Sequence, residues 1–390
     1  MMFSERINRL SGSLIREILS LTQRPGVISF AGGLPAADVM PAFDFSQLPD
    51  SLRQYGPSEG ESILREKIAA HAQQLGIQAT ADQVLILSGS QQALDLTAKL
   101  FIDPGTPILV EAPTYLAALQ NFRLFGAEMH ELALQPSGID PAELAAKAKC
   151  HRPAFCYLIP TFQNPSGYCY DAATRQAVAR TLDELALPLI EDEPYRELAY
   201  DKAERRPLCA DLHTAPFIYC GSFSKTATPG LRVGYLVASP TLMPNLIKLK
   251  QAADLHTNRI GQWLLANWLD SPAYQEHILK TRAYYRQQRD IMLTALANHC
   301  GELATWDTPP GGLFIWARLN QQIDTRRLLQ ATMAQNVAFM PGEPFFATPV
   351  DAAGCIRLNF SHATADAVEQ GIAIIKDALQ QAFVNQKNCT

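Results

Sequence analysis

The chain has 390 residues, of which 47% are hydrophobic and 18% are charged, and its formal net charge is −5. This length is too great for one small hydrophobic core and favours two domains. The slight negative charge argues against a nucleic-acid partner, which needs a basic surface, and no apolar run is long enough to cross a membrane.

Cysteine usage and the N-terminus bear on the compartment. The eight cysteines are scattered singly without any CxxC pair, which suits a reducing compartment better than a disulfide framework or a zinc site. Residues 1–6 lack the continuous apolar stretch of a signal peptide. We therefore expect a cytoplasmic protein.

The first segment, residues 1–45, is expected to be an N-terminal arm that packs with the smaller of two domains. A short amphipathic helix over residues 14–19 precedes an extended stretch, 27–35, that stops at two glycines and a proline. Residues 53–62 then have the composition of a turn, and residues 64–74 have helical periodicity.

Residues 46–285 are expected to form a large, doubly wound α/β domain. Short, nearly continuous apolar runs recur there, most of them separated by stretches with helical periodicity. Continuous rather than alternating apolarity is typical of strands buried on both faces, in a mainly parallel sheet covered by helices. The runs are 84–87, 107–110, 155–159, 187–190, 217–220 and 236–238.

Residues 286–390 contain three further strand-like runs and a terminal amphipathic helix, which predicts a small α+β domain.

Polar and aromatic side chains follow five of these runs. Ligands in open α/β sheets bind outside the carboxyl ends of the strands, so we expect these side chains to converge on one crevice. The first four turns carry Ser90 and Gln91, Tyr115, Asn164, and Asp192 with Tyr195. The fifth run leads into a loop that carries a lysine.

Lys225 lies in this loop, 221–235, between two apolar runs. Lysine is seldom buried without a reason, because its ammonium group is costly to desolvate. A lysine with a lowered pKa is suited to form a Schiff base with a carbonyl, while Ser222, Ser224 and Arg232 supply donors for an anion. A carbonyl cofactor that carries an anion is pyridoxal phosphate. The alternative is a surface loop whose lysine is solvated.

Taken together, these segments resemble a known family. The motifs that carry the resemblance are Ser222-Phe223-Ser224-Lys225, Pro229-Gly230-Leu231-Arg232, Asn164-Pro165-Ser166-Gly167 and Asp192-Glu193-Pro194-Tyr195. They are similar to those of the fold type I pyridoxal-phosphate aminotransferases of class I/II, and the resemblance covers essentially the whole chain. Residues 28–35, 54–56, 88–96 and 253–257 resemble the branch that holds 2-aminoadipate aminotransferase and kynurenine aminotransferase II.

The resemblance implies a role for each residue at the cofactor. Lys225 would hold pyridoxal 5'-phosphate as a Schiff base and then act as general base and acid. Asp192 would keep the pyridine nitrogen protonated, so that the ring accepts electrons. Asn164 and Tyr195 would hydrogen-bond the phenolic oxygen, and Tyr115 would stack on the ring. The phosphate would be held by Ser90, Gln91, Ser222, Ser224 and Arg232.

The resemblance also implies how the substrates, an L-amino acid and a 2-oxo acid, would be bound. Arg357 would clamp the α-carboxylate, and Asn164 would also bind the substrate. Ser13, Arg16 and Gly33 would line the side-chain pocket, where Arg16 could accept a distal carboxylate such as that of glutamate or 2-aminoadipate. The alternative for Arg16 is a solvated arginine on an amphipathic helix.

Tyr55 would reach the phosphate of a neighbouring subunit, which implies a homodimer with shared sites; the alternative is a surface tyrosine in a turn. The implied reaction is ping-pong transfer of an amino group. Two other functions use the same scaffold, a carbon–sulfur β-lyase or decarboxylase and the effector domain of a transcription regulator. The short arm before Phe30 and the negative net charge disfavour the regulator, because such proteins carry a DNA-binding domain ahead of this one.

Overall fold

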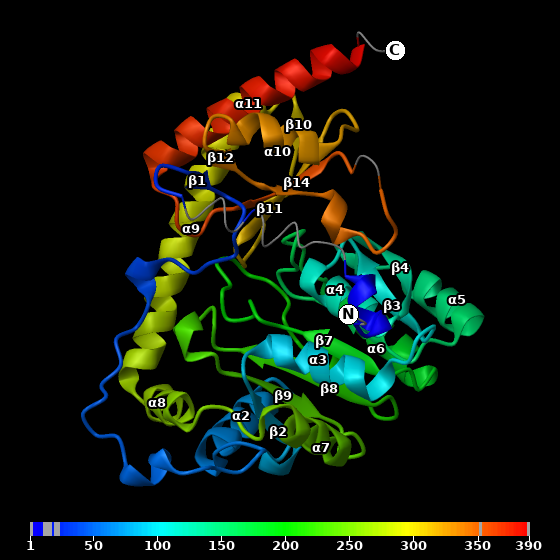
Figure 1. Ribbon diagram of the computed structural model, residues 1–390, viewed down its shortest axis with the longest axis vertical. Helices are drawn as coiled ribbons and strands as arrows, with labels where there is room; N and C mark the ends of the chain where they lie inside the picture. Colours follow the sequence, from blue (N-terminus) through cyan, green and yellow to red (C-terminus); the bar gives the residue numbers. More distant parts are fainter. Residues whose placement is uncertain (1–2, 11–17, 19–23, 351–352, 388–390) are drawn as a thin grey trace.

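The computed structural model describes residues 3–10, 18, 24–350 and 353–387. A large domain built on an eight-stranded sheet and a small domain built on a four-stranded sheet lie one above the other in Figure 1. The long helix α9 (Pro272–Cys300) runs along one side of both. None of the helices in the described ranges is long and apolar enough to span a membrane.

The large sheet has the strand order β2-β9-β8-β7-β6-β3-β4-β5. In chain order its strands are β2 (Val84–Leu87), β3 (Pro107–Ala112), β4 (Glu128–Gln135), β5 (Gly138–Ile139), β6 (Cys156–Leu158), β7 (Leu189–Asp192), β8 (Phe217–Ser222) and β9 (Gly234–Ala238). Neighbours pair in parallel except at β9 and β5. Leu85 and Leu87 pack into the core on one face, and Val84 and Ile86 pack into the core on the other. The predicted mainly parallel, doubly wound sheet is therefore confirmed.

Helices cover both faces of this sheet. They are α2 (Ser62–Gln74), α3 (Ser90–Phe101), α4 (Leu116–Phe125), α5 (Pro141–His151), α6 (Ala172–Glu184), α7 (Met243–Asp254) and α8 (Arg259–Leu269). Local sequence sets their starts: Asp140 caps α5 by accepting a hydrogen bond from the Ala142 amide, and Asp171 caps α6 in the same way. The helical residues between 259 and 300 form two helices, because Pro272 begins α9 after a break at Asp270.

The small domain has an antiparallel sheet of order β10-β11-β14-β13. Its elements are β10 (Ala304–Thr305), β11 (Phe314–Leu319), α10 (Thr325–Met333), β12 (Val337–Ala338), β13 (Met340–Pro341), β14 (Cys355–Asn359) and α11 (Ala365–Lys387). Short 3-10 helices complete the fold: η1 (Glu5–Arg9), η2 (Ala37–Val39), η3 (Asp50–Arg53), η4 (Ala81–Gln83), η5 (Leu208–Asp211), η6 (Pro229–Leu231) and η7 (Glu343–Phe345).

The segment after residue 24 binds the small domain and then passes over the large one. Strand β1 (Ile28–Ser29) pairs in parallel with β12. The Phe30 amide donates to the Ala338 carbonyl at 2.7 Å, and the Asn359 amide donates to the Phe30 carbonyl at 2.8 Å. These bonds bring Gly33 to the carboxyl edge of the large sheet. Most of the helix predicted over 14–19 lies outside the described residues.

Candidate active site

A cavity of about 260 Å³ lies where the carboxyl ends of the parallel strands meet. Ten of the residues predicted from the sequence line it: Ser90, Gln91, Tyr115, Asn164, Asp192, Tyr195, Ser222, Ser224, Lys225 and Arg232. The lining is completed by five residues to which the sequence assigned no role at the site, Leu34, Pro35, Ile159, Pro194 and Pro229. Apolar and proline positions carry no chemical signal of their own, so only the fold identifies them.

Lys225 follows β8 in a turn and reaches into this cavity. Its Nζ donates to the Gly33 carbonyl at 2.8 Å and lies 5.9 Å from the centre of the Tyr195 ring. Burial, and then the positive charges of Arg357 and Arg232, lower the pKa of Lys225 to about 8. A substantial fraction of this amine is therefore neutral near pH 8 and able to attack a carbonyl.

Asp192 ends β7 with one oxygen bonded and the other free. Tyr157 Oη donates to Asp192 Oδ2 at 2.9 Å, while Oδ1 is buried and has no hydrogen-bond partner among the described residues. Burial raises the pKa of Asp192 to about 7, against the lowering effect of the Tyr157 bond. A buried, unpaired carboxylate oxygen suits the protonated ring nitrogen of pyridoxal phosphate. Tyr157 was not predicted to be a site residue, although a phenol buried in an apolar strand needs a hydrogen-bond partner.

The turn between β2 and α3 has the geometry of an anion site. Ser90 and Gln91 form the first turn of α3, whose amides point toward the cavity end of the helix. Arg232 Nη2 donates to the Ser88 carbonyl at 3.2 Å. A Cβ at Gly89 would lie 2.5 Å from Arg232 Nη2, and one at Gly234 would lie 2.6 Å from the Ser90 nitrogen. Both glycines are therefore required for this close approach.

Three groups form the remaining polar wall. Tyr115 Oη donates to Gln91 Oε1 at 3.4 Å. Asn164 Oδ1 accepts from Arg357 Nη1 at 2.7 Å. Tyr195 is 5% exposed, and burial raises its pKa, an effect that the Asn164 side chain partly offsets.

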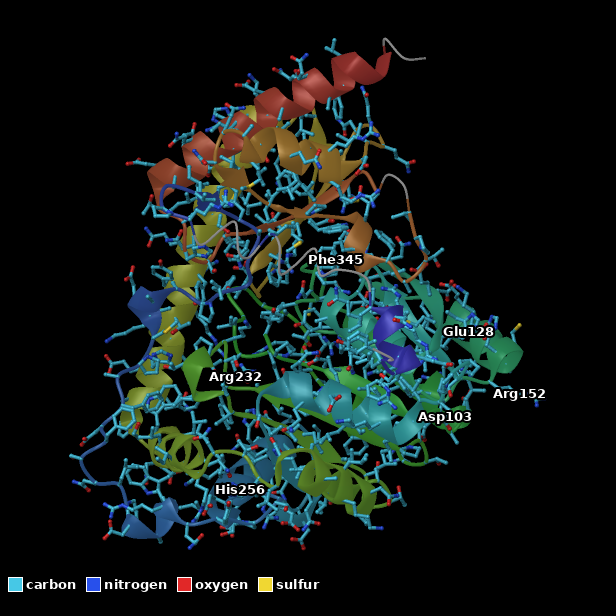
Figure 2. All side chains as sticks on the ribbon, viewed as in Figure 1. Asp103, Glu128, Arg152, Arg232, His256 and Phe345 are labelled. Atoms are coloured by element: carbon cyan, nitrogen blue, oxygen red, sulfur yellow. The ribbon has the colours of Figure 1, made fainter. Side chains whose placement is uncertain are left out.

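Arg357 is a buried cation without an ion-pair partner among the described residues. It lies on β14, is 4% exposed, and donates through Nη2 to the Ala31 carbonyl at 2.5 Å. Its guanidinium stacks 4.2 Å from the centre of the Phe314 ring and 5.1 Å from that of Phe345. Phe345 lies on the side of the small domain that faces the large one (Figure 2). Burial lowers its pKa to about 10, and its Nε has no hydrogen-bond partner within the described part of the chain. Such a group is suited to receive a carboxylate.

Four further residues are predicted to belong to the site. One of them lies outside the cavity, one reaches the site through its backbone, and two are not described. Tyr55 is 75% exposed, its ring lies 5.8 Å from that of His256, and it does not line the cavity of its own chain. Gly33 reaches the site through its carbonyl, and a Cβ there would lie 3.0 Å from the Phe314 ring. Ser13 and Arg16 lie outside the described residues.

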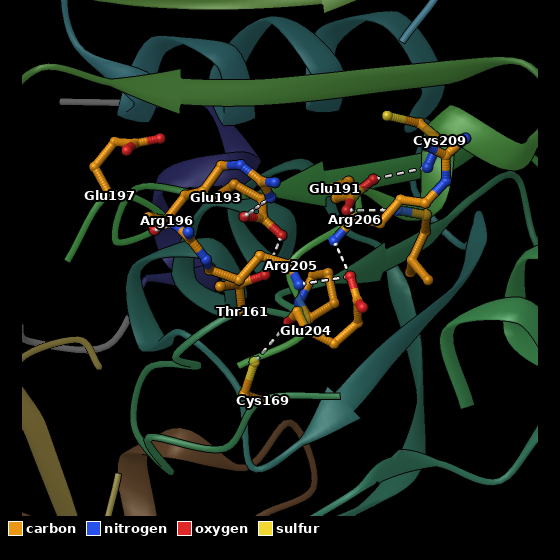
Figure 3. A network of polar contacts seen from close by, with 12 residues as sticks. Thr161, Cys169, Glu191, Glu193, Arg196, Glu197, Glu204, Arg205, Arg206 and Cys209 are labelled. Carbon is orange, nitrogen blue, oxygen red and sulfur yellow. Dashed lines mark hydrogen bonds and ion pairs between the residues drawn. The ribbon is translucent and has the colours of Figure 1, made fainter. Parts of the chain in front are cut away.

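The carboxylates beside Asp192 bond within the protein (Figure 3). Glu191 accepts from the amides of Leu208 and Cys209, each at 2.9 Å. Glu193 accepts from Thr161 Oγ1 at 2.6 Å and from Arg196 Nη1 at 3.1 Å. A second cavity of about 300 Å³ is lined by Glu193 and Arg196 but contains neither Lys225 nor Asp192.

Comparison with known proteins identifies the family of the chain. Residues 26–375 match the family described as aminotransferase class I and II. The chain is 38% identical to 2-aminoadipate transaminase of Thermus thermophilus, over 95% of this chain and 94% of that protein. It is 34% identical to aromatic-amino-acid aminotransferase 1 of Thermococcus litoralis, over 97% and 94%. Its fold matches Thermus thermophilus α-aminoadipate aminotransferase complexed with N-(5'-phosphopyridoxyl)-L-leucine, with a TM-score of 0.89, 35% identity and 98% coverage of both chains. The chain belongs to aminotransferase class I and II and is a pyridoxal-phosphate-dependent aminotransferase.

Proposed function

We propose that this aminotransferase moves the amino group of an L-amino acid with an acidic, aromatic or branched apolar side chain to a 2-oxo acid, by a ping-pong mechanism. The observation that carries the proposal is Arg357, a buried guanidinium that has no carboxylate partner among the described residues and bonds Asn164 beside Lys225. Both substrates carry an α-carboxylate, so one arginine serves both half-reactions. The aminoadipate and aromatic-amino-acid relatives support this range of donors.

Pyridoxal phosphate supplies a carbonyl that reacts with amines and a ring that accepts electrons. Lys225 would attach to that carbonyl through its neutral Nζ with loss of water. Once a substrate amine has replaced it, Nζ would take the proton from the substrate α-carbon and deliver it to the cofactor carbon that had carried the carbonyl. Asp192 Oδ1 would accept a hydrogen bond from the ring nitrogen and keep it protonated, and Asn164 and Tyr195 would bond the phenolic oxygen.

The remaining residues orient the cofactor. Tyr115 would cover one face of the ring. The first turn of α3 and the loop after β8 would hold the phosphate, through Ser90, Gln91, Ser222, Ser224 and Arg232. Arg232 is suited to a bidentate bond that a lysine does not make.

We extend the proposal to a homodimer in which Tyr55 reaches the phosphate of the partner subunit. Its ring is exposed and remote from its own cavity, which leaves it available to another chain. Mixing Tyr55→Ala and Lys225→Ala subunits tests this, because only shared sites regain activity in the mixed dimer.

The unpaired cysteines of the described residues support a reducing, cytoplasmic location.

A half-reaction screen tests the function. The holoenzyme is mixed with single amino acids, including glutamate, 2-aminoadipate, kynurenine, leucine and phenylalanine, and conversion to the pyridoxamine form is followed by absorbance. Conversion without release of ammonia supports amino transfer, whereas release of pyruvate and ammonia from a cysteine S-conjugate without an acceptor would identify a carbon–sulfur β-lyase. If Arg16 binds a distal carboxylate, Arg16→Ala should slow conversion by 2-aminoadipate roughly tenfold and leave leucine unchanged.

A further inference from the structure

The amide of Gln163 lies behind the cavity wall and has every hydrogen-bonding position used. Gln163 is completely buried. Its Nε2 donates to Glu111 Oε2 at 3.1 Å and to the Pro113 carbonyl at 2.7 Å. Its Oε1 accepts from the Ser166 amide at 2.9 Å and from Ser166 Oγ at 2.8 Å. A carboxamide offers two donors and two acceptor sites, so this one is saturated and held in a single orientation.

Glu111 fixes this amide from the end of β3. It is also completely buried, and it accepts from the Ile159 amide at 3.2 Å and from Tyr170 Oη at 2.6 Å in addition to Gln163. Burial raises the pKa of Glu111 to about 7, and the bonds from Tyr170, Gln163 and Ile159 oppose that rise. The carboxyl group therefore anchors Gln163 to both β3 and the end of β6.

Gln163 connects two loops that each contribute a residue to the cavity wall. The Pro113 carbonyl belongs to the loop that ends in Tyr115, and Ser166 belongs to the loop that begins with Asn164. We propose that Gln163 is a positioning residue that keeps Tyr115 and Asn164 in register across the cofactor. The inference rests on the proposed function, because Gln163 does not line the cavity and acts on the cofactor through Asn164.

The test uses the absorbance of the bound cofactor. A donor to the phenolic oxygen favours the deprotonated chromophore, so a misplaced Asn164 should raise the pH midpoint of the absorbance change. Gln163→Leu removes all four bonds with little change in volume. We expect its midpoint to rise by roughly 0.5 to 1 unit, and the affinity of the apoprotein for pyridoxal phosphate, measured by fluorescence quenching, to fall about threefold to tenfold.

A reference variant, Asn164→Ala, separates the possible failures. Asn164→Ala should raise the midpoint at least as far; if it does not, the proposed role of Asn164 fails. If Asn164→Ala shifts the midpoint and Gln163→Leu does not, the positioning role of Gln163 is refuted.

A control for general destabilisation comes from the small domain. Thr325 is completely buried, donates to Glu343 Oε2 at 2.5 Å and accepts from the Gly342 amide at 3.1 Å. Thr325→Val should lower the melting temperature without moving the midpoint. An equal shift in Thr325→Val would overturn the proposal.

A second variant serves if Gln163→Leu fails to fold. Ser166→Ala removes one hydrogen bond to the same amide and should raise the absorbance midpoint by a smaller amount. An unchanged midpoint in Ser166→Ala would refute the positioning role of Gln163.

Discussion

Asp192 and Glu191 are neighbouring carboxyl groups on β7 with the same degree of burial and different surroundings. Both are at most 3% exposed, and burial raises the pKa of each to about 7. Both oxygens of Glu191 accept backbone amides, whereas Asp192 Oδ1 has no partner among the described residues. The raised pKa is therefore common to both groups. What distinguishes Asp192 is an oxygen beside the cavity that is free to accept a hydrogen bond.

Two lysines repeat this contrast. Lys250 has a fully buried side chain, and its Nζ bonds Gln92 at 2.8 Å, Thr257 at 2.9 Å and Asp254 at 2.7 Å. Within the described ranges, Lys225 makes one side-chain hydrogen bond, to the Gly33 carbonyl. Burial lowers the pKa of both amines, and only the one that faces the cavity is left with bonding capacity to spare.

The largest effect is expected for the two lysines. Lys225→Ala should reduce amino transfer by about 10⁴-fold or more, because it removes both the attachment point and the base. Lys250→Met should instead lower the free energy of unfolding by about 3 kcal/mol, since it leaves Asp254 without its cation. Mass spectrometry after borohydride reduction measures attachment: it should be lost in Lys225→Ala and retained in Lys250→Met. Attachment that survives in Lys225→Ala would contradict the assignment.

The carboxyl pair gives the next largest effect. Asp192→Asn should lower kcat roughly 100- to 1,000-fold, because the amide cannot hold the ring nitrogen protonated. Glu191→Gln should lower the free energy of unfolding by about 1–3 kcal/mol, because the new NH₂ group faces a backbone N–H and cannot accept its hydrogen bond. Its kcat should stay nearly unchanged. Steady-state kinetics and thermal melts of both variants distinguish these outcomes. If the two variants lose kcat equally, the contrast between the carboxyl groups has no functional meaning.

Arg357 sharpens the comparison on the small domain. Arg357→Ala should raise KM for both amino and 2-oxo acids by roughly tenfold to a hundredfold. The variant loses the charge-assisted pair with the substrate α-carboxylate, which contributes about 1.5–3 kcal/mol to binding. Arg318 on the adjacent strand β11 already pairs with Asp307 at 2.8 Å, so Arg318→Ala should leave both KM values unchanged. Unchanged KM values for both substrate classes in Arg357→Ala would remove it from the site.

Much of the fold was predictable because parallel strands buried on both faces have a distinctive pattern. Strand β4 was missed for the converse reason: it lies toward the sheet edge, and residues such as Glu128 and His130 are exposed or partly buried. Its sequence therefore lacks a continuous apolar run. The break between α8 and α9 was also missed, although Pro272 marks the start of α9.

The polar turns after the strands identified the lining of the cavity because parallel strands end at one edge. The sequence did not identify the side chains behind that lining. Tyr157 and Gln163 act through contacts with residues 35 and 52 positions away, Asp192 and Glu111, and such pairings follow from strand order rather than local pattern. The position of Tyr55 outside its own cavity likewise depends on the tertiary fold.

The smallest expected effect concerns the pH dependence of cofactor attachment. The neutral amine attacks the carbonyl, so the attachment rate of the apoprotein should rise with pH and level off above about 8 rather than above the ordinary lysine value of 10.5. Arg357 contributes to the lowered pKa of Lys225, so Arg357→Ala should move the midpoint upward by about 0.5 unit. Stopped-flow absorbance at saturating pyridoxal phosphate measures the midpoint, with Arg318→Ala as the control that leaves it in place. A midpoint near 10.5 in the unmodified chain, or a downward shift in Arg357→Ala, would show that burial and neighbouring charge do not set the reactivity of this lysine.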